Sequence, residues 1–92
     1  MIVIVKGSFD RDTDKIRSKN LKQELTGKLL QIEKAKDISQ ITGLKLLRGY
    51  THHYRIYVNT DKLKYRIGAA IRGDKIWLIR FLKRKVVYSK FP

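Results

Sequence analysis

The apolar residues of this chain repeat every three or four positions in its first half and every second position in its second half. The first spacing is that of helices that pack by one face, and the second is that of half-buried strands. Ahead of both, residues 1–5 form an apolar, β-branched run that predicts a strand. The pattern therefore predicts a small single α+β domain over residues 1–92: a strand, two helices and a three-stranded antiparallel meander.

Two helices are expected in the first half. Acidic and hydroxyl side chains up to Asp14 suit a helix N-terminus and predict a first helix over residues 11–18. Asn20 is the expected N-cap of the second helix, with Gln23 completing a capping box. Residues 37–49 are expected to be an irregular connection with apolar side chains under the sheet. The apolar stripe of the second helix consists of Leu21, Leu25, Leu29 and Ile32.

The meander is predicted from the alternation of apolar and cationic residues along residues 54–58 and 63–72. Gly73-Asp74 is a two-residue hairpin signal. The third strand, residues 75–82, is apolar on both faces and is therefore expected in the interior of the sheet, with its aromatic rings in packing.

The loop between the first two meander strands sets the register of the predicted sheet. With Thr60-Asp61 as a two-residue loop, Arg55 lies directly opposite Arg66. Like charges opposed across two strands destabilise a sheet, so this pairing favours an anion bound between them.

Strand parity extends this basic face, on the side of the sheet away from the helices. Tyr57 and Lys64 lie one step further along it, and the hairpin places Phe81 opposite Arg66. Cations on a sheet face also serve simply as solvated gatekeepers against edge pairing, but acids are nearly absent from this face. The chain beyond the last strand would bring Arg84 and Tyr88 to its rim.

The net charge is strongly positive and unevenly distributed. The chain has 22 Lys and Arg against 8 Asp and Glu, for a formal charge of +14. Residues 1–47 contribute 10 cations and 6 acids, or +4, and residues 48–92 contribute 12 cations and 2 acids, or +10. Such a field attracts nucleic acid, an acidic protein or an anionic membrane. Aromatic residues among the cations, and no long basic amphipathic helix, favour nucleic acid.

Several classes of protein are excluded by the motifs that the sequence lacks. It has no cysteine, hence no disulfide or thiolate site, which suits the cytoplasm. It has no apolar stretch of membrane-spanning length and no targeting segment. It also lacks a phosphate-binding glycine loop, a metal-ligand spacing and a serine nucleophile elbow, so no cofactor or metal is expected.

Three segments of the sequence resemble the RelE/ParE superfamily of bacterial toxins, and more specifically the RelE-type ribosome-dependent mRNA interferases. They are Tyr54-Arg55-Ile56, Tyr65-Arg66-Ile67-Gly68, and the ending Lys83-Arg84-Lys85-Val86-Val87-Tyr88 followed by Phe91-Pro92. The resemblance also covers the order of strand, helices and sheet. It implies that the concave face of the sheet holds mRNA in the ribosomal A site, and that the neighbouring 2′-hydroxyl attacks to leave a cyclic phosphate.

The resemblance also implies roles for individual residues. Arg66 matches the arginine on the scissile phosphate, Arg84 the one that stabilises it, and Tyr88 the tyrosine that orients the nucleotide. Arg55 and Tyr57 stand where the nuclease has lysines, and neither a guanidinium nor a phenol is an effective base at neutral pH. The expected catalytic residues are Arg66, Arg84, Tyr88 and Arg55, and the expected RNA-binding residues are Tyr57, Lys64, Lys83 and Lys85.

Proton transfer is the least determined part of this assignment. Lys83 stands where several relatives have a histidine, which leaves Lys64, His52 and His53 as candidates for moving protons. The partners implied are mRNA, the ribosome and an acidic antitoxin, with no membrane and no small-molecule cofactor. Two alternatives stay open: a ParE-like toxin that binds DNA gyrase without cleaving RNA, and a non-catalytic RNA-binding protein.

Overall fold

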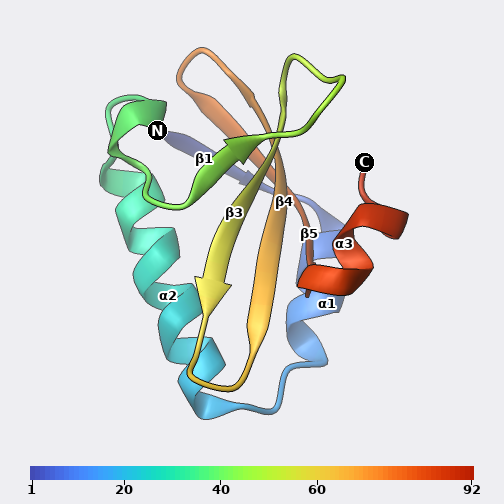
Figure 1. Cartoon of the computed structure of the whole chain (residues 1–92). Coiled ribbons are helices and arrows are strands. Elements are labelled where there is room, and N and C mark those ends of the chain that lie inside the picture. The colour runs from blue at the N-terminus through green and yellow to red at the C-terminus, as the bar shows by residue number, and fades with distance from the viewer.

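The structure is a computed structural model that describes all residues from 1 to 92. A five-stranded sheet in the order β1-β5-β4-β3-β2 forms its centre, with β1 parallel to β5 and the other neighbours antiparallel (Figure 1). The predicted α+β class is confirmed, and the short edge strand β2 and the helix α3 were not predicted. In chain order the elements are β1 (Ile2–Val5), α1 (Gly7–Asp14), α2 (Lys19–Lys34), the short 3₁₀ turn η1 (Ile38–Gln40), β2 (Leu44–Leu46), β3 (His53–Asn59), β4 (Lys64–Arg72), β5 (Lys75–Lys83) and α3 (Arg84–Lys90).

Both N-terminal helices begin earlier than the sequence pattern predicted. The first starts at Gly7, so that the acids after it lie inside the helix instead of ahead of it. The second is capped by Ser18, whose Oγ accepts a hydrogen bond from the amide of Leu21 at 3.2 Å. This hydroxyl already satisfies the third amide of the helix, so the predicted capping box of Asn20 and Gln23 is wrong.

The hydrophobic core lies between the sheet and the helices α1 and α2. Every second residue of β3 and β4 points into it, as the alternation predicted. The apolar stripe of α2 packs on the same core, with Leu29 at its partly buried margin. The buried members of the core are Phe9, Ile16, Leu21, Leu25, Ile32, Ala35, Ile41, Ile56, Val58, Ile67, Ala69, Ile71, Ile76, Leu78 and Phe81.

The loop between β3 and β4 is longer than predicted, and the register shifts with it. The last cross-strand pair is Asn59 with Lys64, which leaves a four-residue loop. Thr60 closes this loop, because its Oγ1 accepts a hydrogen bond from the amide of Leu63 at 2.9 Å. A shift of two keeps every side chain on its predicted face but changes its partner. The predicted pairing of Arg55 with Arg66 is therefore wrong.

A bulge between β4 and β5 overturns a second pairing. The Gly73-Asp74 hairpin forms as predicted, with Arg72 opposite Lys75. Further along, Gly68 pairs with Arg80 while its neighbour Ala69 pairs with Leu78, which leaves one extra residue on β5. The extra residue reverses the faces beyond it, so that Leu82 lies opposite Arg66 and Phe81 points into the core.

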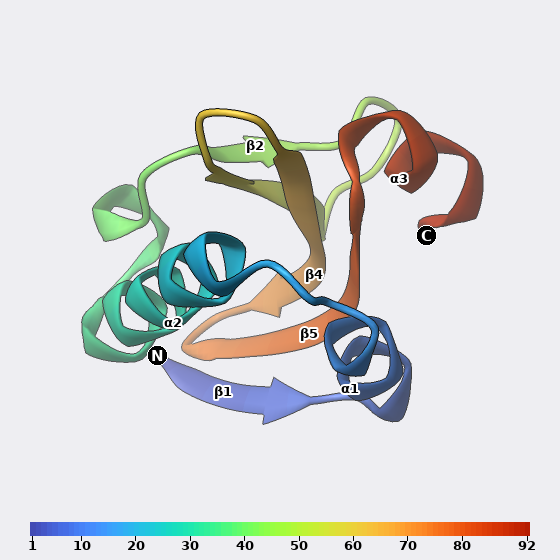
Figure 2. The same cartoon turned by 90° about the horizontal axis from the view of Figure 1, so that it is seen from below.

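The helix α3 lies on the face of the sheet that the sequence pattern left uncovered. Seen from below, α2 and α3 lie on opposite sides of the curved sheet (Figure 2). The chain after α3 packs Phe91 against Gly68, where a Cβ would stand 2.7 Å from the ring. This close approach requires glycine in the middle of β4. We call this side the open face and the core side the covered face.

Candidate nucleic-acid interface

Four of the predicted site residues form one cluster on the open face, from β3, β4 and α3. The phenol ring of Tyr57 lies over the guanidinium of Arg66, with the Cζ atom 4.0 Å from the ring centroid. The guanidinium of Arg55 lies 5.4 Å from the rings of both Tyr57 and Tyr88. Cations thus alternate with aromatic rings across the face, an arrangement that cation–π attraction stabilises. We call these residues the arginine–tyrosine cluster: Arg55, Tyr57, Arg66 and Tyr88.

The most unusual member of the cluster is Arg66, because only 4% of its surface is exposed. One terminal nitrogen, Nη1, donates hydrogen bonds to Asn59 Oδ1 at 2.9 Å and to the carbonyl of Tyr65 at 2.7 Å. Its Nε is buried and has no hydrogen-bond partner. No carboxylate pairs with this cation, since the ion pair of the structure joins Arg80 to Asp12. A buried guanidinium with an unused donor favours an anion as its missing partner.

The electrostatic environment of Arg66 leads to the same conclusion. Burial lowers the pKa of its guanidinium from the ordinary value, and the nearby positive charges of Arg55 and Arg84 lower it further. A guanidinium nevertheless keeps its proton, so a buried positive charge remains and destabilises the folded protein. A bound phosphate would relieve both the desolvation and the repulsion.

The remaining predicted residues line a basic groove beside the cluster, where β4, β5 and α3 meet. The groove encloses about 450 Å³, and no carboxylate lines it. Arg84 is the first residue of α3, and its charge also acts on Arg66. Its position connects the groove to the cluster. The groove is lined by Lys62, Leu63, Lys64, Tyr65, Lys83, Arg84 and Lys85.

The predicted basic face is thus divided into two neighbouring parts. Lys64 belongs to the groove and lies opposite Asn59, not opposite Tyr57 as the shorter loop would have required. The histidines His52 and His53 line another hollow, near the start of β3. Among the candidates for moving protons, only Lys64 therefore lies beside Arg84.

Two features that build this site were not predicted from the sequence. The ending from Arg84 to Tyr88, predicted as an extension beyond the sheet, is helical, and a spacing of four residues places these two side chains on one side of the helix. Asn59, which holds Arg66 by a hydrogen bond, was not among the predicted site residues. Its role depends on the loop length, for which the sequence offered no clear signal.

Two further observations concern ligands and membranes. No group of three or more His, Asp or Glu side chains lies close enough together to hold a metal ion. None of the helices combines the length and apolar character that a membrane crossing needs.

Comparison with known proteins places the chain in a family. No protein-family model matches it. It is 39% identical over 67 residues to Toxin RelE3 of Methanocaldococcus jannaschii, a match that covers 68% of this chain and 72% of the relative. Its fold matches a chain in the crystal structure of the RelB-RelE antitoxin-toxin complex from Methanococcus jannaschii, with a TM-score of 0.74 at 24% identity. That match covers 97% of this chain and 99% of the other. The identity to RelE3 over this length shows that the chain belongs to the RelE family of toxins.

Proposed function

We propose that this toxin is an endoribonuclease that cleaves mRNA in the ribosomal A site and so stops translation. The observation that carries the proposal is Arg66, a buried cation with an unpaired donor on the open face. Cation–π contact with Tyr57 covers one face of the guanidinium, whereas its N–H donors lie in the plane of the group and stay able to form hydrogen bonds. Such a donor set suits a phosphate better than any apolar or cationic ligand.

The proposed chemistry is attack by the 2′-hydroxyl of the bound RNA on its adjacent phosphate, which yields a cyclic phosphate and expels the 5′-oxygen. Negative charge increases on the phosphoryl oxygens in the transition state. Arg66 stabilises that charge from the cluster and Arg84 from the groove. The ring of Tyr88 positions a nucleotide, and Arg55 fixes this ring. Preorganised donors of this kind supply on the order of 3 kcal/mol each without moving a proton.

The basic groove extends the same surface toward the neighbouring phosphates. Lys64, Lys83 and Lys85 contribute charge there, and together with Arg84 they would bind the RNA backbone in a salt-dependent manner. Lys64 lines the same groove as Arg84 and is therefore the candidate for proton transfer. The site needs neither a metal nor an organic cofactor for this reaction.

The proposed partners follow from the same surface and from the relatives. The related RelE structure comes from a complex of antitoxin and toxin, and an acidic antitoxin would neutralise the excess charge of residues 48–92. We further propose that the whole chain acts as one domain in the cytoplasm, where translating ribosomes present the A-site codon.

The experiment that tests the proposal is induction of the chain in a bacterial host, with mRNA 5′ ends mapped by primer extension. We expect new cuts inside translated codons, and their loss in the Arg66→Ala/Arg84→Ala double variant. Arg84→Ala alone should abolish growth inhibition with an unchanged melting temperature, because the residue is exposed. Lys90→Ala, at the exposed far end of α3, is the matched control and should stay toxic.

Two other outcomes would replace this function with another. Growth arrest with intact mRNA would indicate a ParE-like toxin that binds DNA gyrase. The absence of arrest in a well-expressed, folded protein would indicate an RNA-binding protein without catalysis.

A further inference from the structure

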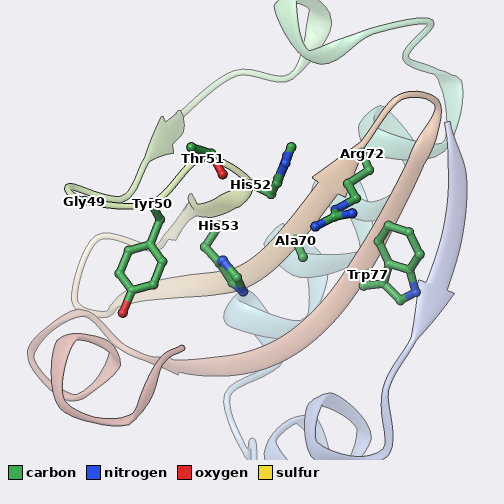
Figure 3. Close-up of a pocket in the computed structure, with 8 residues that line it drawn as sticks. All are labelled: Gly49, Tyr50, Thr51, His52, His53, Ala70, Arg72 and Trp77. Atoms are coloured by element: carbon green, nitrogen blue, oxygen red, sulfur yellow. The ribbon is translucent and has the colours of Figure 1, made fainter.

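A second hollow on the open face lies beyond Phe91, at the opposite end of β4 from the basic groove. It encloses about 590 Å³, and no carboxylate lines it. Its side chains come from the start of β3, the loop before it, and the hairpin end of β4 and β5 (Figure 3). The lining residues are Gly49, Tyr50, Thr51, His52, His53, Ala70, Arg72 and Trp77.

The floor of this hollow is a row of three residues that pair across three strands. His53 lies opposite Ala70, and Ala70 lies opposite Trp77. Two aromatic side chains are therefore separated by a single methyl group, with their backbones about 10 Å apart. Figure 3 shows His53 and Tyr50 on one side of Ala70, and Arg72 and Trp77 on the other. The small central residue leaves a space between the rings that a flat ligand can fill.

The rings around the hollow are exposed to a degree that packing alone does not require. Tyr50 is 45% exposed and touches the protein through His53, with ring centroids 5.2 Å apart in an edge contact. The ring of His53 also contacts the ring of Phe91, with centroids 5.8 Å apart. Phe91 thus fixes the orientation of His53 and separates the hollow from the arginine–tyrosine cluster. Tyr50 and Trp77 keep ring surface free for stacking.

The hollow and the cluster lie along the same two strands. His53 precedes Arg55 by two residues and Ala70 follows Arg66 by four, all on the open face. These separations correspond to about 7 and 13 Å along the strands. A single RNA strand bound at the cluster therefore passes within reach of the hollow. Arg72, whose guanidinium points toward Ala70, is placed to meet its phosphate (Figure 3).

We propose that this hollow is a nucleobase subsite: one base of the bound RNA, adjacent to the scissile step, lies over Ala70 between the ring of Trp77 and the pair of rings of His53 and Tyr50, while Arg72 contacts its phosphate. The proposal rests on the proposed function only in that RNA is the ligand. Exposed rings beside a cation, with no acid to repel phosphate, are the combination that binds unpaired nucleotides. The subsite would make cleavage depend on the nucleotide that flanks the cut.

Trp77 allows a direct test, because it is the only tryptophan of the chain. Its fluorescence is followed while the purified toxin is titrated with a short 2′-O-methyl RNA, which binds but cannot be cleaved by its own 2′-hydroxyl. We expect quenching by the base-bearing RNA and none by an abasic strand of the same length. Equal changes with both strands, or none with either, would overturn the subsite.

Variants separate stacking from simple charge attraction. Tyr50→Ala should weaken binding of the base-bearing strand by about 5- to 150-fold, while Tyr50→Phe, which keeps the ring, should bind as the parent does. Arg72→Ala should reduce both the affinity and its salt dependence, and Lys34→Ala, an exposed lysine at the end of α2 on the other side of the sheet, should not. Unchanged binding by Tyr50→Ala would contradict the proposal.

The outcomes also distinguish this inference from the cleavage proposal. Quenching that is lost in Tyr50→Ala, in a protein that leaves mRNA intact, would support the subsite and reject the nuclease. Cuts in mRNA that are identical in rate and position for parent and Tyr50→Ala would reject the subsite and support the nuclease. If an antitoxin peptide quenches Trp77 where RNA does not, the hollow is a protein-binding site and the proposal is wrong.

Discussion

The two faces of β4 place opposite demands on neighbouring residues. Ile67 is fully buried on the covered face, where apolar side chains surround it. Arg66, one residue earlier, is almost as buried on the open face, but it has an unpaired Nε and two further arginines near it. The covered face is therefore organised for stability, whereas the open face keeps a buried charge without a counter-charge. Such a cost in a folded protein is typical of a functional site.

The largest effects should come from substituting Ile67 and Arg66 one at a time. Ile67→Ala removes buried methyl groups and should lower the free energy of unfolding by about 2 to 5 kcal/mol. Arg66→Met keeps the volume but removes the charge, so the free energy of unfolding should change by less than about 1 kcal/mol. Cleavage by Arg66→Met should fall on the order of 100- to 1,000-fold. Urea denaturation and primer extension measure the two quantities on the same protein preparations.

The comparison of the two faces would fail in either of two ways. If Arg66→Met destabilises the protein as strongly as Ile67→Ala, Arg66 is a structural residue held by Asn59 and Tyr57. If Arg66→Met cleaves mRNA at the parental rate, the open face does not bind the scissile phosphate.

A smaller effect on stability is expected at the bulge in β5, beyond which the side chains of this strand change faces. The carboxylate of Asp12 in α1 accepts hydrogen bonds from Arg80 Nε at 2.7 Å and from the amide of Phe81 at 2.9 Å. Ser8 of the same helix donates a hydrogen bond to the carbonyl of Ile79. Asp12→Asn should lower the free energy of unfolding by about 1.5 to 3 kcal/mol at pH 7. Asp14→Asn, an exposed acid at the end of α1, should change it by less than about 0.5 kcal/mol.

The pH dependence of this contribution follows from the pKa of Asp12. Burial by itself raises that pKa, but the hydrogen bonds from Arg80 and the Phe81 amide and the charge of Arg80 lower it below the ordinary value. A depressed carboxyl pKa stabilises the fold fully above the pKa of the unfolded chain, and that stability is lost as the pH falls through the folded pKa. The difference between parent and Asp12→Asn should therefore shrink below about pH 4. A difference that is constant from neutral to acidic pH would mean that the charge has no role.

These residues also show why the sequence predicted one face better than the other. Alternation assigns Ile56 and Ile67 to the covered face whatever the loop length, since a shift of two residues keeps every side chain on its side. The partner of Arg66 does depend on the loop, and the hydroxyl of Thr60 closes a longer loop than the pattern suggested. Residue types on the open face were thus predictable, but their contacts were not.

The bulge and the last helix were beyond prediction for a similar reason. The bulge is stabilised by Ser8 and Asp12, which lie about seventy residues away in the chain. Local pattern contains no information about such distant partners, so Phe81 was assigned to the wrong face. The pattern predicted only an extension beyond the last strand where α3 forms, because a helix of seven residues gives too short a periodic signal.

The smallest effect should separate the ring of Tyr88 from its hydroxyl. This residue is 57% exposed, its ring contacts Arg55, and its hydroxyl has no hydrogen-bond partner in the protein. Tyr88→Ala removes a stacking surface and should slow cleavage by about 5- to 150-fold. Tyr88→Phe keeps the ring beside Arg55 and should slow it by less than about fivefold, as initial rates of cleavage would measure. If Tyr88→Phe is as slow as Tyr88→Ala, the hydroxyl itself acts on the reacting groups, and the open face would contain a proton-transferring residue besides its cations.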